Sequence, residues 1–207
     1  MMSYYLAIDM GASSGRHILG SIEDGKIKLE EIYRFENGIS KIGDEYCWDI
    51  QGLFNEIKKG IKKCKEIGKV PKTIGIDTWA VDFVLLDEND EMLGNVVAYR
   101  DDRTEGYMEK AFQVIPQDML YLYTGIQFQR FNTLAIKDKN PEYLKKAKTF
   151  LMIPDYLNFL LTGKKANEYT NATSTQLVNS FDRTWDKNIL KEYGINEEMF
   201  QEIKMPK

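Results

Sequence analysis

Hydrophobic and polar positions alternate along the first part of the chain, which predicts β-strands. An apolar run at residues 5–8 ends at Asp9, a second run occupies 18–22, and residues 26–35 alternate between apolar and polar side chains. The connections between these runs are short turns of small and polar residues. Three successive strands joined in this way predict the antiparallel beginning of a sheet.

The period changes to that of an amphipathic helix over residues 49–68. Asp49 is a suitable N-cap and Gly68 a suitable residue just beyond the helix end. The apolar stripe of this helix consists of Ile50, Leu53, Phe54, Ile57, Ile61, Cys64 and Ile67. Because a helix between strands implies a crossover connection, we expect the next strand to be parallel to one of the first three.

The rest of the chain is predicted to contain a few more strands and mostly helices. Strands are expected at 73–79, 81–86, 93–99 and 149–152, helices at 104–114, 116–123, 132–139, 141–147, 154–162 and 190–203, and an ordered loop with a short helix at 171–179. No repeat, low-complexity tract or flexible linker marks a boundary, so we expect one lobe over 1–207. The pattern predicts an α/β fold with a mixed sheet and helical insertions.

Composition narrows the class of protein. The chain has 207 residues and a formal net charge of -4, which gives no basic field for binding nucleic acid. No apolar run is long enough to span a membrane. Cys47 and Cys64 fit no metal spacing and are typical of reduced residues in a cytoplasmic protein. The only histidine, His17, argues against a His-rich metal site and against a Ser-His-Asp triad.

The turn after the first strand is a candidate phosphate site. It offers backbone N–H groups flanked by small side chains, two hydroxyls and the cation Arg16, with Asp9 at its mouth. Asp9 is placed to hold a magnesium ion through its waters. The small residues of the turn are Gly11, Ala12, Ser13, Ser14 and Gly15. The alternative is an ordinary hairpin in which the glycines only supply unusual backbone angles.

Two further polar clusters follow the later strands. Asp77, at the end of a predicted parallel strand, lies where ligands meet an open α/β sheet, and Trp79 suits the C–H face of a sugar. Asp82 follows closely, and Asp101 with Arg103 would present hydrogen bonds to sugar hydroxyls. The alternatives are acids that cap turns, a tryptophan that is plain core, and a surface salt-bridge cluster.

Taken together, these stretches resemble the N-terminal domain of the FGGY sugar kinases, and within that family the kinases that act on L-rhamnulose. The residues that carry the resemblance are IDMGASSGR, GIDTWAVDFVLLD, AYRDDRT, FNTL, LMIPDYLNFLLTG and NEYTNATSTQL, in this order over nearly the whole chain. The resemblance implies the actin/hexokinase-like (ribonuclease H-like) ATPase fold. It also implies ATP-dependent phosphorylation of L-rhamnulose at its primary hydroxyl, with Mg²⁺ as cofactor.

The resemblance also assigns expected roles to residues. It implies that Asp9 is the acid on the magnesium side, and it implies a phosphate-binding turn made of Ala12, Ser13, Ser14, Gly15 and Arg16. The expected sugar site consists of Asp77, Thr78, Trp79, Ala80, Asp82, Asp101 and Arg103. Two positions depart from the family pattern: Ala80 replaces a sugar-contacting glycine, and Ala135-Ile136-Lys137 stands where a polar glutamine is expected.

The family's general-base aspartate lies in an HDT-like motif, which this sequence lacks. We therefore expect the base and the C-terminal lobe to lie downstream, and we expect no turnover by this chain alone. Three interpretations stay open: a truncated kinase, a lobe that binds sugar or phosphate without chemistry, and a subunit that pairs with a separate C-terminal lobe or with its own copies. Ribulose, xylulose or fuculose also remain possible substrates.

Overall fold

The computed structural model describes residues 2–127 and 131–206. The chain divides into two compact units. Unit 1 consists of Met1–Lys41 and Trp48–Trp79, and unit 2 of Ile42–Cys47 and Ala80–Lys207. The chain passes from one unit to the other within β4 (Ile39–Ile42), within β5 (Glu45–Trp48) and again after Trp79. The hydrophobic pattern does not predict the two short strands β4 and β5.

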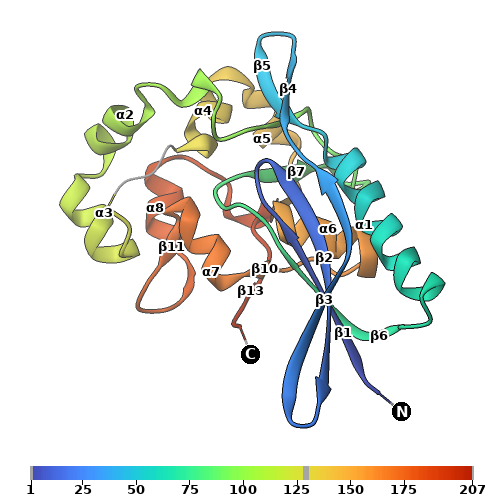
Figure 1. Cartoon of the computed structure of the whole chain (residues 1–207). Coiled ribbons are helices and arrows are strands. Elements are labelled where there is room, and N and C mark those ends of the chain that lie inside the picture. The colour runs from blue at the N-terminus through green and yellow to red at the C-terminus, as the bar shows by residue number, and fades with distance from the viewer. Residues whose placement is uncertain (1, 128–130, 207) are drawn as a thin grey trace. The chain divides into compact units, whose positions relative to one another are not determined.

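Unit 1 is built on a four-stranded sheet in the order β3-β2-β1-β6 (Figure 1). The strands are β1 (Tyr4–Met10), β2 (Ser14–Glu23), β3 (Lys26–Glu36) and β6 (Pro71–Asp77). β1 pairs antiparallel with β2 and β2 with β3, whereas β6 runs parallel to β1. The predicted mixed sheet, with three antiparallel strands followed by a crossover helix, is confirmed.

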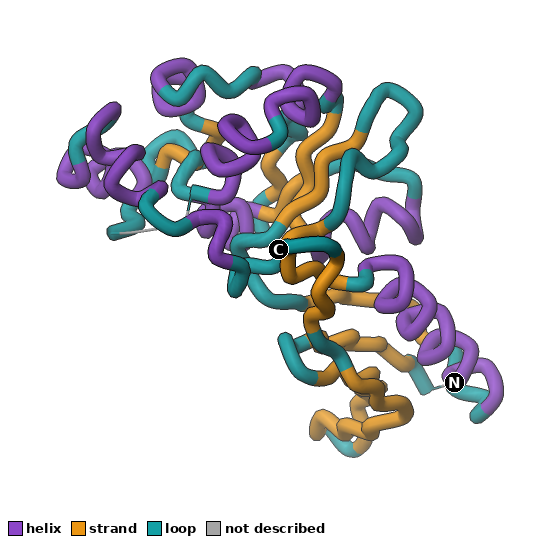
Figure 2. Tube along the Cα trace, turned by 90° about the horizontal axis from the view of Figure 1, so that it is seen from above, coloured by secondary structure: helices purple, strands orange, loops and turns teal. Residues whose placement is uncertain are grey.

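The crossover helix α1 (Ile50–Glu66) begins and ends where its capping residues predict. The Asp49 carboxylate accepts the N–H of Gly52 at 2.8 Å, and Gly68 takes a φ of 71° just after the helix. Figure 2 shows α1 running beside the strands of unit 1. Its buried side chains include Leu53, Ile57 and Cys64, so the apolar stripe covers one face of the sheet.

His17 lies between the sheet and α1 and has no exposed surface. Its ring approaches the helix at Gly60, where the missing side chain leaves room for it. Burial lowers the pKa of His17, so the imidazole is neutral and packs as part of the core. Cys64 on the helix and Cys47 in unit 2 are both buried free thiols, as expected.

Unit 2 has a small two-stranded centre surrounded by short elements. β7 (Phe83–Leu86) pairs antiparallel with β9 (Thr149–Met152), and every residue of both strands is buried. The helices are α2 (Tyr107–Val114), α3 (Gln117–Thr124), α4 (Asn132–Lys139), α5 (Pro141–Lys146), α6 (Ile153–Thr162), α7 (Tyr169–Ala172) and α8 (Lys187–Glu192). The remaining short elements are β8 (Val96–Val97), β10 (Asn167–Glu168), β11 (Val178–Asn179), β12 (Thr184–Trp185), β13 (Ile203–Lys204), and the 3₁₀ helices η1 (Asp102–Thr104), η2 (Thr173–Thr175) and η3 (Glu197–Met199).

Aromatic side chains fill the core of unit 2. The ring of Phe150 on β9 lies 4.4 Å from that of Phe83 on β7 and 4.7 Å from that of Phe200, measured between centroids. Trp185 closes the group at 4.6 Å from Phe200. The start of β7 is therefore anchored in a packed core, directly after the polar residue Asp82.

The predicted helix at 190–203 is wrong. α8 spans Lys187–Glu192, the chain then turns at Gly194 with a φ of 62°, and η3 and β13 follow. The apolar residues that suggested one helix belong to separate short elements, each of which buries its own.

The predicted strand at 73–79 also ends earlier, at Asp77, so Thr78 and Trp79 lie beyond β6. Only Val96–Val97 of the predicted strand at 93–99 is a strand. Among the described residues, no helix is both long and apolar enough to cross a membrane.

Candidate functional site

The turn between β1 and β2 is closed by hydrogen bonds of its own backbone and flanked by an ion pair. Gly11 N–H donates to Ser14 O at 2.9 Å. Asp9 and Arg16 are opposite each other in the antiparallel pairing, and both Nε and Nη2 of Arg16 reach Asp9 Oδ2, at 2.9 and 2.8 Å. Both side chains are over 40% exposed, so the pair contributes little to stability but orients both groups at the mouth of the turn.

A third strand holds the turn from the side through Asn37, a residue that the sequence analysis missed. Asn37 follows β3 and donates twice: its side-chain Nδ2 reaches Gly11 O at 2.8 Å and its backbone N–H reaches Ser13 O at 3.0 Å. Its own side-chain oxygen accepts the N–H of Gly38 at 2.8 Å. These bonds fix the turn in one conformation before any ligand arrives.

Gly15 has a packing reason to be glycine. It is buried on β2, and a Cβ built there would lie 2.1 Å from the ring of Phe35 on β3. Ala12 and Ser14 are half-buried and Ser13 is exposed, so small side chains leave the backbone of the turn accessible. The arrangement fits an anion that is bound by backbone N–H groups and hydroxyls.

We predict that Asn37→Ala loosens this turn. The substitution removes the side-chain donor to Gly11 O, and we expect the unfolding free energy to fall by about 1 kcal/mol. Affinity for an anion at the turn should fall several-fold as well, because the turn is no longer held before binding. Chemical denaturation and a titration with inorganic phosphate measure the two effects. Asn55→Ala, an exposed position on α1, is the matched control.

Asp77 is brought beside the turn by the parallel pairing of β6 with β1. Asp9 and Asp77 are direct partners in this register, so two carboxylates stand at the carboxyl ends of neighbouring strands. This is the location expected from the sequence. Asp77 is exposed, and Asp9 keeps Oδ1 outside its pair with Arg16.

These two acids fit a magnesium ion that keeps much of its water. Their oxygens are the hard ligands that Mg²⁺ prefers, and the anion-binding turn lies next to them. No group of three or more His, Cys, Asp or Glu side chains among residues 2–127 and 131–206 forms a complete metal site. The protein would therefore supply only part of the coordination shell, with water and phosphate oxygens completing it.

Trp79 stacks on a second tryptophan within unit 1. The ring centroids of Trp48 and Trp79 are 4.0 Å apart with an interplanar angle of 31°. Trp48 is only 4% exposed, whereas Trp79 is half-buried. Trp79 is therefore fixed on one side and retains some accessible surface, and Thr78, whose hydroxyl donates to Trp79 O at 2.9 Å, lies next to it.

In unit 2, Asp82 is buried with 1% exposure. Its Oδ2 accepts the N–H of Tyr99 at 3.1 Å, and its Oδ1 lies 3.5 Å from Nδ2 of Asn132. Asn132, on α4, also accepts from Nε of Arg103 at 3.4 Å. Asn132 thus joins two of the predicted sugar-site residues, although the sequence analysis did not select it.

Asp101 is buried and serves the backbone. It is the N-cap of η1, with Oδ1 accepting the N–H of Arg103 at 2.8 Å and Oδ2 accepting that of Tyr46 at 2.8 Å. Asp101 therefore positions the backbone of Arg103 and not its guanidinium, so its predicted role as a direct hydrogen-bond partner of sugar has a structural alternative.

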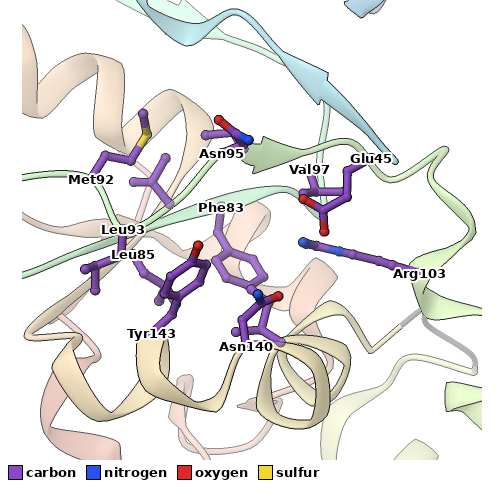
Figure 3. A pocket seen from close by; sticks show the side chains of 13 residues that line it. Glu45, Phe83, Leu85, Met92, Leu93, Asn95, Val97, Arg103, Asn140 and Tyr143 are labelled. Carbon is purple, nitrogen blue, oxygen red and sulfur yellow. The ribbon is translucent and has the colours of Figure 1, made fainter. Parts of the chain in front are cut away.

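The guanidinium of Arg103 points into a pocket of unit 2, toward the carboxylate of Glu45 (Figure 3). Asn140 and Tyr143 add polar groups to the wall, and Phe83 adds an apolar one. Burial lowers the pKa of Arg103, and the negative charges of Glu45, Asp82 and Asp101 raise it. A guanidinium stays charged in proteins, so this pocket holds a cation with donors available to hydroxyl or carboxylate groups.

Ala80 is exposed and is followed by a strained residue. Val81 has a φ of 71°, and its N–H donates to the hydroxyl of Ser174 at 3.1 Å. Alanine at position 80, where the family pattern has glycine, therefore places its methyl group at an exposed position. Neither Val81 nor Ser174 was selected from the sequence.

Comparison with known proteins identifies the class. Residues 4–206 match the N-terminal domain of the FGGY family of carbohydrate kinases, and the chain belongs to this family. Its fold follows that of solved members: a gluconate kinase from Lactobacillus acidophilus superposes with a TM-score of 0.87 at 21% identity, covering 100% of this chain and 42% of that one. The predicted actin-like ATPase fold is confirmed.

Two similar sequences indicate a particular kind of kinase within this family. The chain is 59% identical over 209 residues to a rhamnulokinase from Halalkalibacterium halodurans, covering 99% of this chain and 44% of that protein. It is 54% identical to a rhamnulokinase from Oceanobacillus iheyensis, covering 100% of this chain and 45% of that protein. The chain thus spans less than half the length of the curated relatives it matches.

Proposed function

We propose that this chain is the sugar- and phosphate-binding part of a kinase that phosphorylates L-rhamnulose with ATP to give L-rhamnulose 1-phosphate. The observation that carries the proposal is the 59% identity to a rhamnulokinase over 99% of this chain. The family uses ATP, and we assign its phosphates to the turn of unit 1, which Asn37 holds in place.

In this proposal one set of residues binds phosphate and Mg²⁺, and a second set binds the sugar. Ala12, Ser13, Ser14, Gly15 and Arg16 bind phosphate oxygens through backbone N–H groups, hydroxyls and one positive charge. Asp9 holds Mg²⁺ through water, and the ion would neutralise charge on the phosphates. We assign sugar contacts to Asp77, Thr78 and Trp79 in unit 1 and to Ala80 and Arg103 in unit 2, and the buried Asp82 and Asp101 position the residues around them.

The proposed reaction requires a general base, and we assign this role to none of the residues described above. The primary hydroxyl of the sugar attacks the γ-phosphorus, the bond to the β,γ-bridging oxygen breaks, and the hydroxyl proton passes to a general base. We infer that the base and the C-terminal lobe belong to the part of the kinase beyond the matched region. The chain would then act in the cytoplasm as one part of a two-lobed enzyme, with the C-terminal lobe as its partner.

Sugar binding by the 207-residue chain tests this function. Calorimetric titration should detect L-rhamnulose binding, and D-xylulose and L-fuculose should bind more weakly. We expect Asp77→Ala to weaken L-rhamnulose binding about 10-fold or more, because it removes charged hydrogen-bond acceptors. Asp118→Ala, which removes an exposed carboxylate on α3, is the matched control.

An assay of ADP formation with magnesium-ATP and L-rhamnulose complements the titration. We expect no sugar-dependent ADP from this chain alone. Sugar-dependent turnover would mean that an acid present here, Asp77 or Asp82, serves as the base. Tighter binding of D-xylulose or L-fuculose would assign the chain to a kinase for that ketose, and binding of none of the three would contradict the proposal.

A further inference from the structure

Val81 adopts a backbone conformation that its side chain disfavours. Its φ of 71° lies in the left-handed region, which a β-branched residue occupies only when the surrounding structure enforces it. It stands between Ala80 and Asp82, two residues of the expected sugar site. The conformation of Val81 therefore determines the direction of the backbone between Ala80 and Asp82.

The backbone of Val81 is hydrogen-bonded to the hydroxyl of Ser174. Val81 N–H donates to Ser174 Oγ at 3.1 Å, and Ser174 Oγ donates in turn to Asn171 O at 2.6 Å. A hydroxyl that accepts and donates at once is fixed in orientation, and each bond strengthens the other. Val81 and Ser174 are 93 positions apart in the chain, so this contact is tertiary and not local.

Ser174 is itself held rigidly. Asn171 belongs to α7, where its N–H is capped by the carboxylate of Glu168 at 3.0 Å. The N–H of Glu168 is held by Asp155 on α6, with both carboxylate oxygens at 3.2 Å. A continuous series of hydrogen bonds therefore runs from α6 through α7 to the backbone of Val81.

The other side of Val81 is fixed independently. Asp82 is held by Tyr99 N–H and lies against Asn132, and β7 begins at the next residue in the packed aromatic core. With Asp82 anchored and Val81 clamped, the backbone of Ala80 has little freedom. The exposed Ala80 is thus presented by a rigid support.

We propose that Ser174 is a positioning residue for sugar binding: its hydroxyl holds Val81 in the left-handed conformation and so fixes the backbone at Ala80 against which the sugar lies. This inference rests on the proposed function, because it takes L-rhamnulose as the ligand of that site. The clamp itself is a property of unit 2 that can be measured without sugar.

The first arm of the test measures the clamp directly. Amide hydrogen exchange of Val81, followed by NMR, should be about 10-fold faster or more in Ser174→Ala than in the wild type, because the N–H loses its acceptor. Ser174→Thr keeps a hydroxyl and should restore protection. Thr173→Ala is the matched control, since it removes the neighbouring hydroxyl, which donates to Thr170 O at 2.7 Å.

The second arm measures sugar binding. Ser174→Ala should weaken L-rhamnulose binding about 10-fold, with Ser174→Thr close to the wild type and Thr173→Ala unchanged. Glycine occupies the left-handed region without a side-chain clash, so in a Val81→Gly background the same Ser174→Ala change should weaken binding less than threefold. A merely structural role for Ser174 would give the same loss in both backgrounds.

The outcomes separate the clamp from the function. Equal losses in both backgrounds, or unchanged Val81 exchange in Ser174→Ala, would overturn the positioning role. If the wild type fails to bind L-rhamnulose, the proposed function and the sugar part of this inference both fall, and the exchange arm still decides whether Ser174 clamps Val81.

Discussion

Replacing Asp155 by asparagine will raise the stability of the protein at pH 8 and remove most of a pH dependence between about pH 4 and pH 7. The pKa of Asp155 is raised from 3.8 to about 7: burial is the main cause, the backbone N–H of Glu168 opposes it, and the negative charge of Glu168 adds to it. A shift of this size corresponds to about 4 kcal/mol of unfolding free energy. The effect is the largest that we expect from any single titrating group described here.

The sign follows from which state holds the proton. Between the two pKa values the folded protein keeps the Asp155 proton, whereas the unfolded chain releases it. Stability from this group is therefore full below about pH 4, falls as pH rises, and is lost above about pH 7. Asp155 is 7% exposed, and within residues 2–127 and 131–206 the hydrogen bonds to its carboxylate come from the N–H of Glu168.

Urea denaturation at pH values from 4.5 to 8, in steps of about 0.5 pH unit, measures how the unfolding free energy depends on pH. Asparagine keeps an oxygen that can accept the Glu168 N–H, so the Asp155→Asn protein should stay folded and show a flatter profile. Asp118→Asn, which removes an exposed negative charge, is the control for net charge. A profile in Asp155→Asn as steep as that of the wild type would show that other groups cause the dependence.

Gly60→Ala will destabilise unit 1 even though alanine favours helices. A Cβ at position 60 would lie 2.2 Å from Cδ2 of His17, whose ring has no exposed surface and packs against the rings of Tyr33 and Phe35. Overpacking of this kind costs about 1–3 kcal/mol, and the clash here is with a rigid ring, so we expect the upper half of that range. The gain in helix propensity, about 1 kcal/mol, offsets only part of the cost.

Thermal and urea denaturation of Gly60→Ala measure the loss. Gly75→Ala on β6 is the matched control, because a Cβ there meets nothing within 4 Å. The loss should shrink when His17→Ala is added, since the smaller side chain makes room. A Gly60→Ala protein as stable as the wild type would mean that α1 and the sheet can separate without cost, contrary to the close contact described above.

The elements predicted best from sequence are those whose signals are local. α1 has a regular apolar stripe and residues suited to both caps, and the first three strands are separated by recognisable turns. The helix expected at 190–203 failed because Leu190, Ile195 and Met199 are apolar at compatible spacings, yet Gly194 breaks the chain between them. Apolar residues that are buried from several short elements can therefore have the same sequence spacing as one helix face.

The candidate site divides in the same way. The phosphate turn and Asp77 could be located from sequence, because the turn is contiguous and the end of a parallel strand is a general position for ligands. Asn37, Asn132 and Ser174 could not, since each reaches its partner across 26, 50 and 93 positions respectively. Nothing in a single sequence pairs residues so far apart. Tertiary structure alone gives these polar side chains their roles.

Asn37 is hydrogen-bonded to both Gly11 and Ser13, and these bonds set the length of the turn between β1 and β2. One inserted residue would move β2 by one position against β1, and successive side chains of a strand face opposite ways. Arg16 would then turn from Asp9 toward the apolar stripe of α1, and His17 would leave the core for the open face. We therefore expect a change in the length of this turn to disrupt unit 1 more than a substitution at its exposed residue Ser13.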